Sequence, residues 1–218
     1  MRLILRNIGF IALLISVGAF AAIAQAKASI PKTLFYDSDG NPVSNNEFVD
    51  IRMANPNYPD RTLMRTLDDG TVEFRLQKIP QEGMRAPDFA FETLDGKTIS
   101  SSELRGKVVV LNFWFIGCSV CRAIKPKLNT FEKKFDGRDD VVFIAATGDQ
   151  PRDVRNFAKQ EPLEYIQTAG AGEELKKFVF NGYPKNIVIS RTGEIVYWRT
   201  TIHAWDKFES VVRAELGK

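Results

Sequence analysis

Cys118 and Cys121 are the only cysteines of this chain, and two residues separate them. The apolar run from Val108 to Trp114 comes shortly before them and predicts a buried strand. After them, apolar residues recur at steps of three and four, a spacing typical of one face of a helix. We therefore expect both sulfur atoms at the point where a strand ends and a helix begins.

This placement favours nucleophilic chemistry at Cys118. Free amide N–H groups and the positive end of the helix dipole stabilise a thiolate at a helix N-terminus. In Cys-X-X-Cys sites the thiol pKa falls from about 8.5 to between roughly 3.5 and 7.5. Cys118 is then expected to attack a disulfide, and Cys121, one turn later, is expected to resolve the mixed disulfide that forms.

A purely structural role for the two cysteines is the alternative. Structural zinc needs four ligands, and Cys118, Cys121 and the single histidine, His203, supply three. A disulfide between the two cysteines closes a ring so small that it restricts the unfolded chain little. We therefore expect no metal and no bound cofactor, only a redox-active disulfide, and we expect His203 at the surface or at a helix start.

The composition limits the size of the core and the classes of partner. Of the 218 residues, 44% are hydrophobic, which is enough for one good core and a smaller appendage. The formal net charge is +3, and Arg2 and Arg6 account for two of these charges. So little excess charge gives no reason to expect a nucleic-acid partner.

Residues 1–26 have the features of an export signal. Arg2 and Arg6 precede a long uncharged run that ends in alternating small residues, so cleavage before Lys27 is expected. The run is also long enough to remain as an N-terminal membrane anchor. Either outcome predicts a periplasmic or otherwise exported protein, in a compartment where disulfides persist.

The remaining chain divides into two parts. Turn signals and alternating segments within residues 27–82 predict a β-rich leader packed on the main domain, with short strands at 48–51 and 71–76. Residues 83–218 alternate strands and helices, which predicts an α/β fold. The further strands are expected at 98–99, 108–114, 141–146, 165–167, 186–189 and 194–198, and helices at 100–106, after the cysteines, and at 151–160, 173–180 and 205–216.

Several motifs of residues 83–218 occur in the order known from one family. They are Ala86-Pro87-Asp88-Phe89, Leu94-Asp95-Gly96-Lys97, the run from Leu104 to Trp114, Cys118-Ser119-Val120-Cys121, Pro126 and Gly182-Tyr183-Pro184. Together they resemble the thioredoxin-like thiol-disulfide oxidoreductases of the bacterial periplasm, the TlpA/ResA group. The resemblance implies a thioredoxin-like fold with a central mixed sheet flanked by helices. It also implies protein thiols and disulfides as substrates and a membrane-bound electron donor.

The resemblance also implies roles for single residues. Cys118 would be the surface-facing, attacking thiol, and Cys121 the buried, resolving one. Pro184 would be a cis-proline whose neighbour Tyr183 pairs through its backbone with the substrate peptide. Trp114 and Phe115 would form part of the substrate-binding wall, although plain core and rim aromatics are the alternative for both.

Two positions depart from the family pattern. Many relatives carry a glutamate where this chain has Ile124, and thioredoxin carries a buried aspartate where it has Asn112. Without these carboxylates the proton acceptor for Cys121 is unassigned, with Asp149 as a suggestion. We therefore expect a slower or differently poised catalyst, working as an exported disulfide reductase.

Two other functions are compatible with parts of the pattern. One is a non-catalytic thioredoxin-fold module that binds a peptide or a partner protein. The other is a peroxiredoxin-like thiol peroxidase, because the Pro87-Asp88-Phe89 motif also occurs in that class. Peroxiredoxins place threonine or serine three residues before the reactive cysteine, where this chain has Phe115, so that fit is poor.

Overall fold

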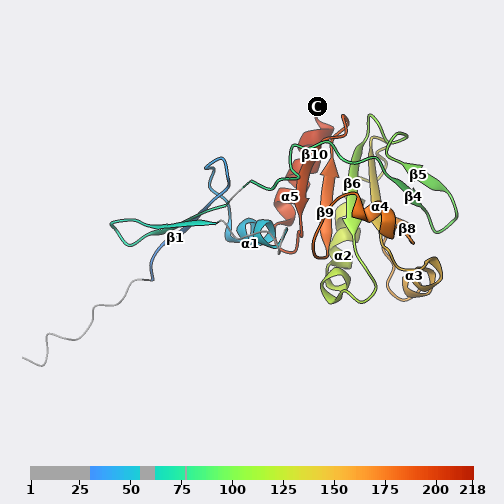
Figure 1. Ribbon diagram of the computed structural model, residues 1–218, viewed down its shortest axis with the longest axis horizontal. Helices are drawn as coiled ribbons and strands as arrows, with labels where there is room; N and C mark the ends of the chain where they lie inside the picture. Colours follow the sequence, from blue (N-terminus) through green and yellow to red (C-terminus); the bar gives the residue numbers. More distant parts are fainter. Residues whose placement is uncertain (1–29, 55–61, 77) are drawn as a thin grey trace, which may run out of the picture. The chain divides into compact units, whose positions relative to one another are not determined.

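A computed structural model describes residues 30–54, 62–76 and 78–218, and a five-stranded sheet forms its centre (Figure 1). The strand order is β10-β9-β6-β7-β8. The strands are β6 (Val108–Phe113), β7 (Val141–Ala146), β8 (Ile166–Thr168), β9 (Lys185–Ile189) and β10 (Ile195–Arg199). β7 is parallel to β6 and β8, whereas β9 is antiparallel to β6 and β10. The predicted fold class, a mixed sheet flanked by helices, is confirmed.

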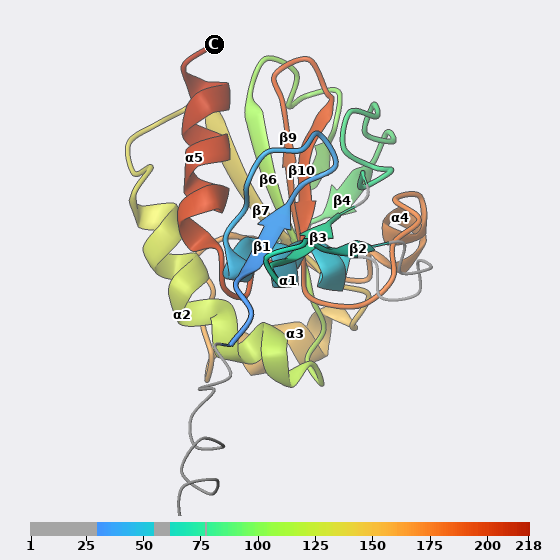
Figure 2. The ribbon, with the colours of Figure 1, turned by 90° about the vertical axis from the view of Figure 1, so that its left-hand side faces the viewer.

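Apolar side chains cover both faces of this sheet, because successive residues of a strand point to opposite sides. Val108 and Val110 of β6 belong to one buried cluster, and Val109 and Leu111 to another. The first cluster includes residues of α2 (Ser119–Lys133), α3 (Pro151–Ala158) and α5 (Trp205–Leu216). The second includes residues of α1 (Asn45–Ala54), β4 (Ala90–Glu92), which pairs with β5 (Thr98–Ser100), and α4 (Gly172–Lys176). α2 and α5 lie together on one side of the sheet, and α4 lies on the other (Figure 2).

The leader contains a three-stranded sheet of order β1-β3-β2. Its strands are β1 (Thr33–Tyr36), β2 (Leu63–Thr66) and β3 (Val72–Arg75). β3 confirms the strand expected at 71–76, but the strand expected at 48–51 is wrong, because those residues lie in α1. Phe48 and Ile51 are three residues apart, so a helix brings both onto one buried face, at 6% and 8% exposure.

Hydrogen bonds join α1 to the end of β10 and to the segment between β10 and α5. Asp50 is fully buried, and its carboxylate accepts hydrogen bonds from the backbone N–H groups of Ile202, His203 and Ala204 at 2.8–3.3 Å. Glu47 accepts from the Arg199 guanidinium at 3.0 Å. The His203 side chain is exposed, two residues before α5, as expected.

The helix expected at 100–106 is absent, and the helices expected at 151–160 and 173–180 end earlier, at Ala158 and Lys176. Ser100 and Glu103 exchange the hydrogen bonds of a capping box, from Ser100 N–H to the carboxylate at 2.9 Å and from Glu103 N–H to the hydroxyl at 3.4 Å. The following residues form turns instead of a helix, because so short a segment gains too few bonds to offset nucleation. The helix expected at 173–180 is α4, which ends at Lys176.

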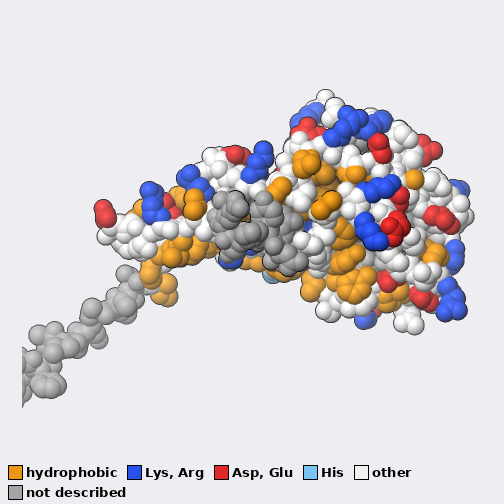
Figure 3. Space-filling view, viewed as in Figure 1, with side chains coloured by type: hydrophobic (Ala, Val, Ile, Leu, Met, Phe, Trp, Pro, Cys, Tyr) orange, Lys and Arg blue, Asp and Glu red, His pale blue; other side chains and the backbone are white. Residues whose placement is uncertain are grey.

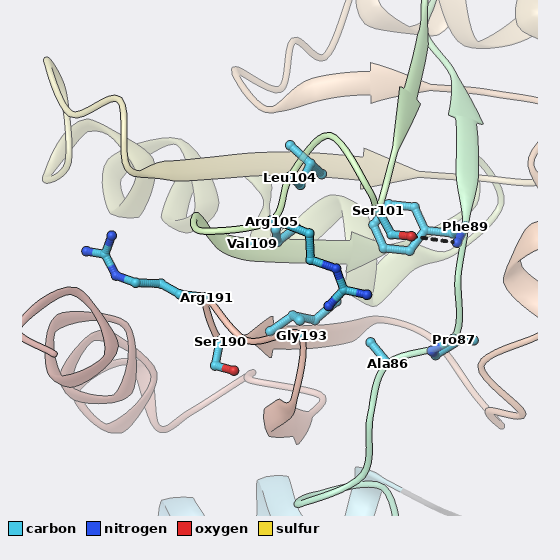
Figure 4. Close-up of a pocket in the computed structure, with 11 residues that line it drawn as sticks. Ala86, Pro87, Phe89, Ser101, Leu104, Arg105, Val109, Ser190, Arg191 and Gly193 are labelled. Atoms are coloured by element: carbon cyan, nitrogen blue, oxygen red, sulfur yellow. Dashed lines mark hydrogen bonds between the residues drawn. The ribbon is translucent and has the colours of Figure 1, made fainter.

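A pocket lies at the end of β6 opposite to the cysteines (Figure 4). The Arg105 side chain reaches across it to donate to the carbonyl of Thr192 at 3.1 Å. Gly193 has a φ of +89°, and a Cβ atom there would overlap the Arg105 Nη1 atom. The positive φ therefore favours glycine at this position, where the Gly193 carbonyl accepts the N–H of Ala86.

Residues 1–26, the expected signal peptide or anchor, lie outside the described residues. Across the ranges that the structure does describe, no helix is both long enough and apolar enough to cross a membrane. The expected boundary between the leader and the main domain at residues 82 and 83 stays a prediction.

Candidate active site

The two cysteines lie between β6 and α2. β6 ends at Phe113, and Cys118 is the N-cap residue of α2. The Cys118 sulfur accepts the backbone N–H of Cys121 at 3.1 Å, and the two sulfurs form a disulfide. The expected strand-to-helix junction is thus confirmed, and the helix N-terminus directs an N–H group at the sulfur that would carry the thiolate charge.

Both cysteines are largely buried. Cys118 is 7% exposed and Cys121 is 2% exposed, and both pack in the apolar cluster with Trp114. Cys121 is buried as expected, but the surface-facing position expected for Cys118 is wrong, because the disulfide draws its side chain into this cluster. Two apolar residues beside them, Phe115 and Val120, are 38% and 39% exposed. In Figure 3 apolar side chains are visible where α2 and β9 lie in Figure 1. A partner that approaches Cys118 from this side therefore meets apolar side chains.

The loop before β9 supplies a second side of the site. The Tyr183–Pro184 peptide bond is cis, as expected. The Tyr183 ring lies 5.1 Å, centre to centre, from the rings of both Phe115 and Phe180. The fold thus brings together two of the expected substrate-binding residues, Phe115 and Tyr183, from distant parts of the sequence.

Trp114 lies behind this surface. It is 2% exposed, and its ring centre lies 5.7 Å from that of Phe157. The alternative stated above, a core aromatic, therefore describes its position in the structure. Contact between a substrate and Trp114 would have to be indirect, through the residues that cover it.

Asp149, the suggested proton acceptor, is engaged with the loop that leads to the cysteines. Its carboxylate accepts the backbone N–H of Ile116 at 2.7 Å and the hydroxyl of Thr147 at 2.9 Å. Burial raises the pKa of Tyr183, and the charge of Asp149 raises it further. Asp149 thus holds the active-site loop and lies near the cis-proline loop.

A neutral network occupies the place of the missing aspartate. Asn112 is 2% exposed and donates through its amide to the side-chain oxygen of Asn186 at 2.9 Å. Asn186 in turn donates to the carbonyl of Thr200 at 2.6 Å. Both amides stay uncharged at all ordinary pH values, so the network offers no base for Cys121.

Ile124→Glu is expected to raise the rate of disulfide reduction about tenfold, because a carboxylate one turn after Cys121 can accept its proton. Ile124 is 4% exposed in the same cluster as the cysteines, so burial would raise the pKa of the new carboxyl group toward neutrality. Turnover measured between pH 6 and 9 checks this. Ile124→Gln is the neutral control, and an Ile124→Glu rate no higher than the Ile124→Gln rate would count against a missing base.

Two buried lysines near the site escaped the sequence analysis. Lys125 is 5% exposed, and Lys185, directly after Pro184, is fully buried. Burial lowers the pKa of Lys125 to about 8 and that of Lys185 to about 7. Both occur where the sequence pattern calls for apolar residues, within the buried face of a helix and at the start of a buried strand. A lysine at such a position was the signal that could have revealed them.

Among the described residues, no cluster of three or more histidine, cysteine, aspartate or glutamate side chains could hold a metal ion. Cys118 and Cys121 are bonded to each other. A disulfide of this kind can exchange with an external thiol or disulfide.

Comparison with known proteins gives matches to the same part of the chain. The profile of the Redoxin family matches residues 81–212, which is more than half of the chain. Thioredoxin-like protein YneN of Bacillus subtilis is 31% identical over 120 residues, which cover 53% of this chain and 69% of that protein. Thiol-disulfide oxidoreductase ResA of a Bacillus cereus strain is 31% identical over 118 residues, which cover 53% of this chain and 68% of that protein.

Solved structures give the same result. A candidate protein disulfide isomerase from Bacteroides thetaiotaomicron superimposes with a TM-score of 0.56 and 32% identity, covering 64% of this chain and 92% of that one. A thiol:disulfide interchange protein of the thioredoxin family from Chlorobium tepidum superimposes with a TM-score of 0.54 and 25% identity, covering 63% and 99%. These matches confirm the resemblance to the TlpA/ResA group that the motifs indicate.

Proposed function

We propose that this chain, which belongs to the redoxin family and is a thiol-disulfide oxidoreductase, is exported and reduces disulfides in other proteins. The observation that carries the proposal is the disulfide between Cys118 and Cys121 at the N-terminus of α2. The Cys118 sulfur accepts a backbone N–H there, so the site already stabilises negative charge on the sulfur that is to attack.

The proposed reaction proceeds in two exchanges. The Cys118 thiolate attacks one sulfur of the substrate disulfide, which forms a mixed disulfide and releases the other substrate sulfur as a thiolate. Cys121 then loses its proton and attacks the Cys118 sulfur, which releases the second substrate thiolate. The enzyme dithiol is thereby oxidised by two electrons, the substrate disulfide is reduced, and the released thiolates take up protons from water.

The surroundings of Cys118 favour a polypeptide substrate. Phe115 and Tyr183 present aromatic side chains on two sides of the site, and Val120 adds an exposed apolar group between the cysteines. Pro184 has no N–H group, and the residue before a proline tends to be extended. The Tyr183 backbone is therefore the proposed pairing strand for an extended substrate segment, whose apolar side chains would contact Phe115.

A reductase needs its own source of electrons. Each turnover leaves the Cys118–Cys121 disulfide, and two electrons must restore the dithiol. In an oxidising compartment outside the cytoplasm, a membrane-bound dithiol donor is the proposed supplier. Residues 1–26 would serve as the export signal or as an anchor that keeps the protein beside this donor. No further cofactor is needed for either exchange.

The direction of electron flow is tested by the equilibrium reduction potential, measured in redox buffers by alkylation of free thiols. We expect a potential nearer to the roughly −270 mV of thioredoxin than to the roughly −120 mV of the oxidant DsbA. We also expect kcat/KM for insulin to exceed that for glutathione disulfide, because only a polypeptide contacts both Phe115 and Tyr183. A potential close to that of DsbA would overturn the reductase assignment.

A further inference from the structure

A buried lysine lies on the helix that carries the cysteines. Lys125 belongs to α2 and is 5% exposed. Its ammonium nitrogen lies 4.5 Å from the ring centre of Trp114 and 4.0 Å from that of Phe157. It also donates to the backbone carbonyl of Glu161 at 3.1 Å. Two aromatic faces and one carbonyl oxygen therefore hold this cation in place.

The geometry of α2 places Lys125 on the side of the helix that carries Cys121. Lys125 follows Cys121 by four residues, so the two lie on one side of the helix with Cβ atoms about 5–6 Å apart. Side chains in a helix lean toward its N-terminus, and the N-terminal turn of α2 holds Cys118 and Cys121. The Trp114 ring, which the ammonium group contacts, packs in the same buried cluster as both cysteines.

The charged groups that face Lys125 do not neutralise its positive charge. The Glu161 carboxylate is bound by the Arg122 guanidinium, whereas Lys125 contacts the backbone oxygen of Glu161. Burial lowers the pKa of Lys125 to about 8, Glu161 opposes this change and Arg122 adds to it. The ammonium form therefore prevails at pH 7. Asn112 and Ile124, close to the cysteines, add no charge of either sign.

We propose that Lys125 stabilises the thiolate of Cys118 and thereby raises the reduction potential of the cysteine pair. The thiolate exists only in the reduced protein, so a nearby cation lowers the free energy of the dithiol form and leaves the disulfide form unchanged. Burial strengthens the effect, because charges interact more strongly where water is excluded. The inference rests on the proposed thiol-disulfide exchange, and it assigns to Lys125 an indirect, electrostatic role.

Lys125→Met tests this role, because methionine keeps the flexible apolar stem and removes the charge. The pKa of Cys118 is read from the pH dependence of its alkylation by iodoacetamide in the reduced protein. We expect this pKa to rise by about one unit, which is a tenfold change in the thiolate equilibrium. In glutathione buffers the equilibrium constant should move about tenfold toward the disulfide, which corresponds to about 30 mV.

Lys127→Met is the matched control, because Lys127 is an exposed lysine of the same helix. It should change the acid dissociation constant of Cys118 and the equilibrium constant in glutathione buffers by less than about twofold, because exposed charges are screened by solvent. Equal values for wild type and Lys125→Met, or equal shifts in the two variants, would overturn the inference. Wild-type Cys118 alkylated no faster at pH 7 than a free cysteine would instead contradict the proposed function.

A second measurement covers the case in which Lys125→Met does not fold. In the wild type, the alkylation rate of Cys118 should show a second inflection near pH 8, where Lys125 loses its proton and the thiolate becomes more reactive and less stabilised. Neither Arg122 nor Glu161, the charged groups that face Lys125, titrates in that range. Burial lowers the pKa of Lys185 to about 7, so the inflection near pH 8 should also remain in Lys185→Met. A single inflection between pH 6 and 9 would refute the coupling.

Discussion

Cys118→Ser is expected to lower the rate of insulin reduction to that of the uncatalysed reaction with dithiothreitol. A serine hydroxyl stays protonated near neutral pH and does not attack disulfides, so the first exchange has no nucleophile. The Cys118 sulfur accepts an N–H group at the start of α2, and we therefore propose it as the attacking sulfur. We expect kcat/KM to fall by on the order of 10³-fold or more, as for the loss of other enzymatic nucleophiles.

Cys121→Ser is the matched variant, because it removes the other sulfur of the same pair. Cys118 should still form the mixed disulfide, but no neighbouring thiol would resolve it. A covalent adduct with the substrate should therefore accumulate and disappear on reduction, as seen by non-reducing electrophoresis. An adduct in Cys118→Ser and none in Cys121→Ser would reverse the two assignments.

Asp50→Ala is expected to lower the free energy of unfolding by about 3 kcal/mol or more. Three backbone N–H groups, those of Ile202, His203 and Ala204, would lose a charged acceptor at a fully buried position. Each buried donor left without a partner costs about 1–3 kcal/mol. The result would show that residues of the leader are needed for the stability of the main domain, and urea denaturation measures it.

Asp68→Ala is the control for the loss of a leader carboxylate, because Asp68 is exposed. It should change stability by less than about 0.5 kcal/mol. Asp50→Asn keeps one acceptor oxygen, so its loss of unfolding free energy should lie between those of Asp50→Ala and Asp68→Ala. Equal midpoints for Asp50→Ala and Asp68→Ala would show that the contacts of α1 do not stabilise the main domain.

The sequence predicts an element correctly where its hydrophobic pattern fits only one type of secondary structure. β6 is an unbroken apolar run of strand length, and α2 combines a helical period with cysteines at its start. The segment from Phe48 to Ile51 has two interpretations, because four residues with three apolar members fit a strand or a helix. The segment forms the helix α1 because Phe48 and Ile51 are buried against the main sheet. The local sequence does not contain that contact.

The site was predictable only as far as its motif extends. The motif gives Cys118, Cys121 and the cis peptide bond before Pro184, and the structure adds how Tyr183 and Phe115 meet. The burial of Trp114 and the position of Lys125 depend on α3 and on the loop at Glu161, which are far along the chain. No local pattern contains these contacts, so they required the fold.

One measurement tests the exchange mechanism most directly. The reduced wild-type protein is mixed with an excess of a protein disulfide, quenched with an alkylating reagent after short intervals and mapped by mass spectrometry. The mechanism predicts that a substrate cysteine appears first on Cys118, followed by the Cys118–Cys121 disulfide as the substrate thiols are released. A substrate adduct on Cys121, or an intact substrate disulfide after the enzyme has become oxidised, would contradict it.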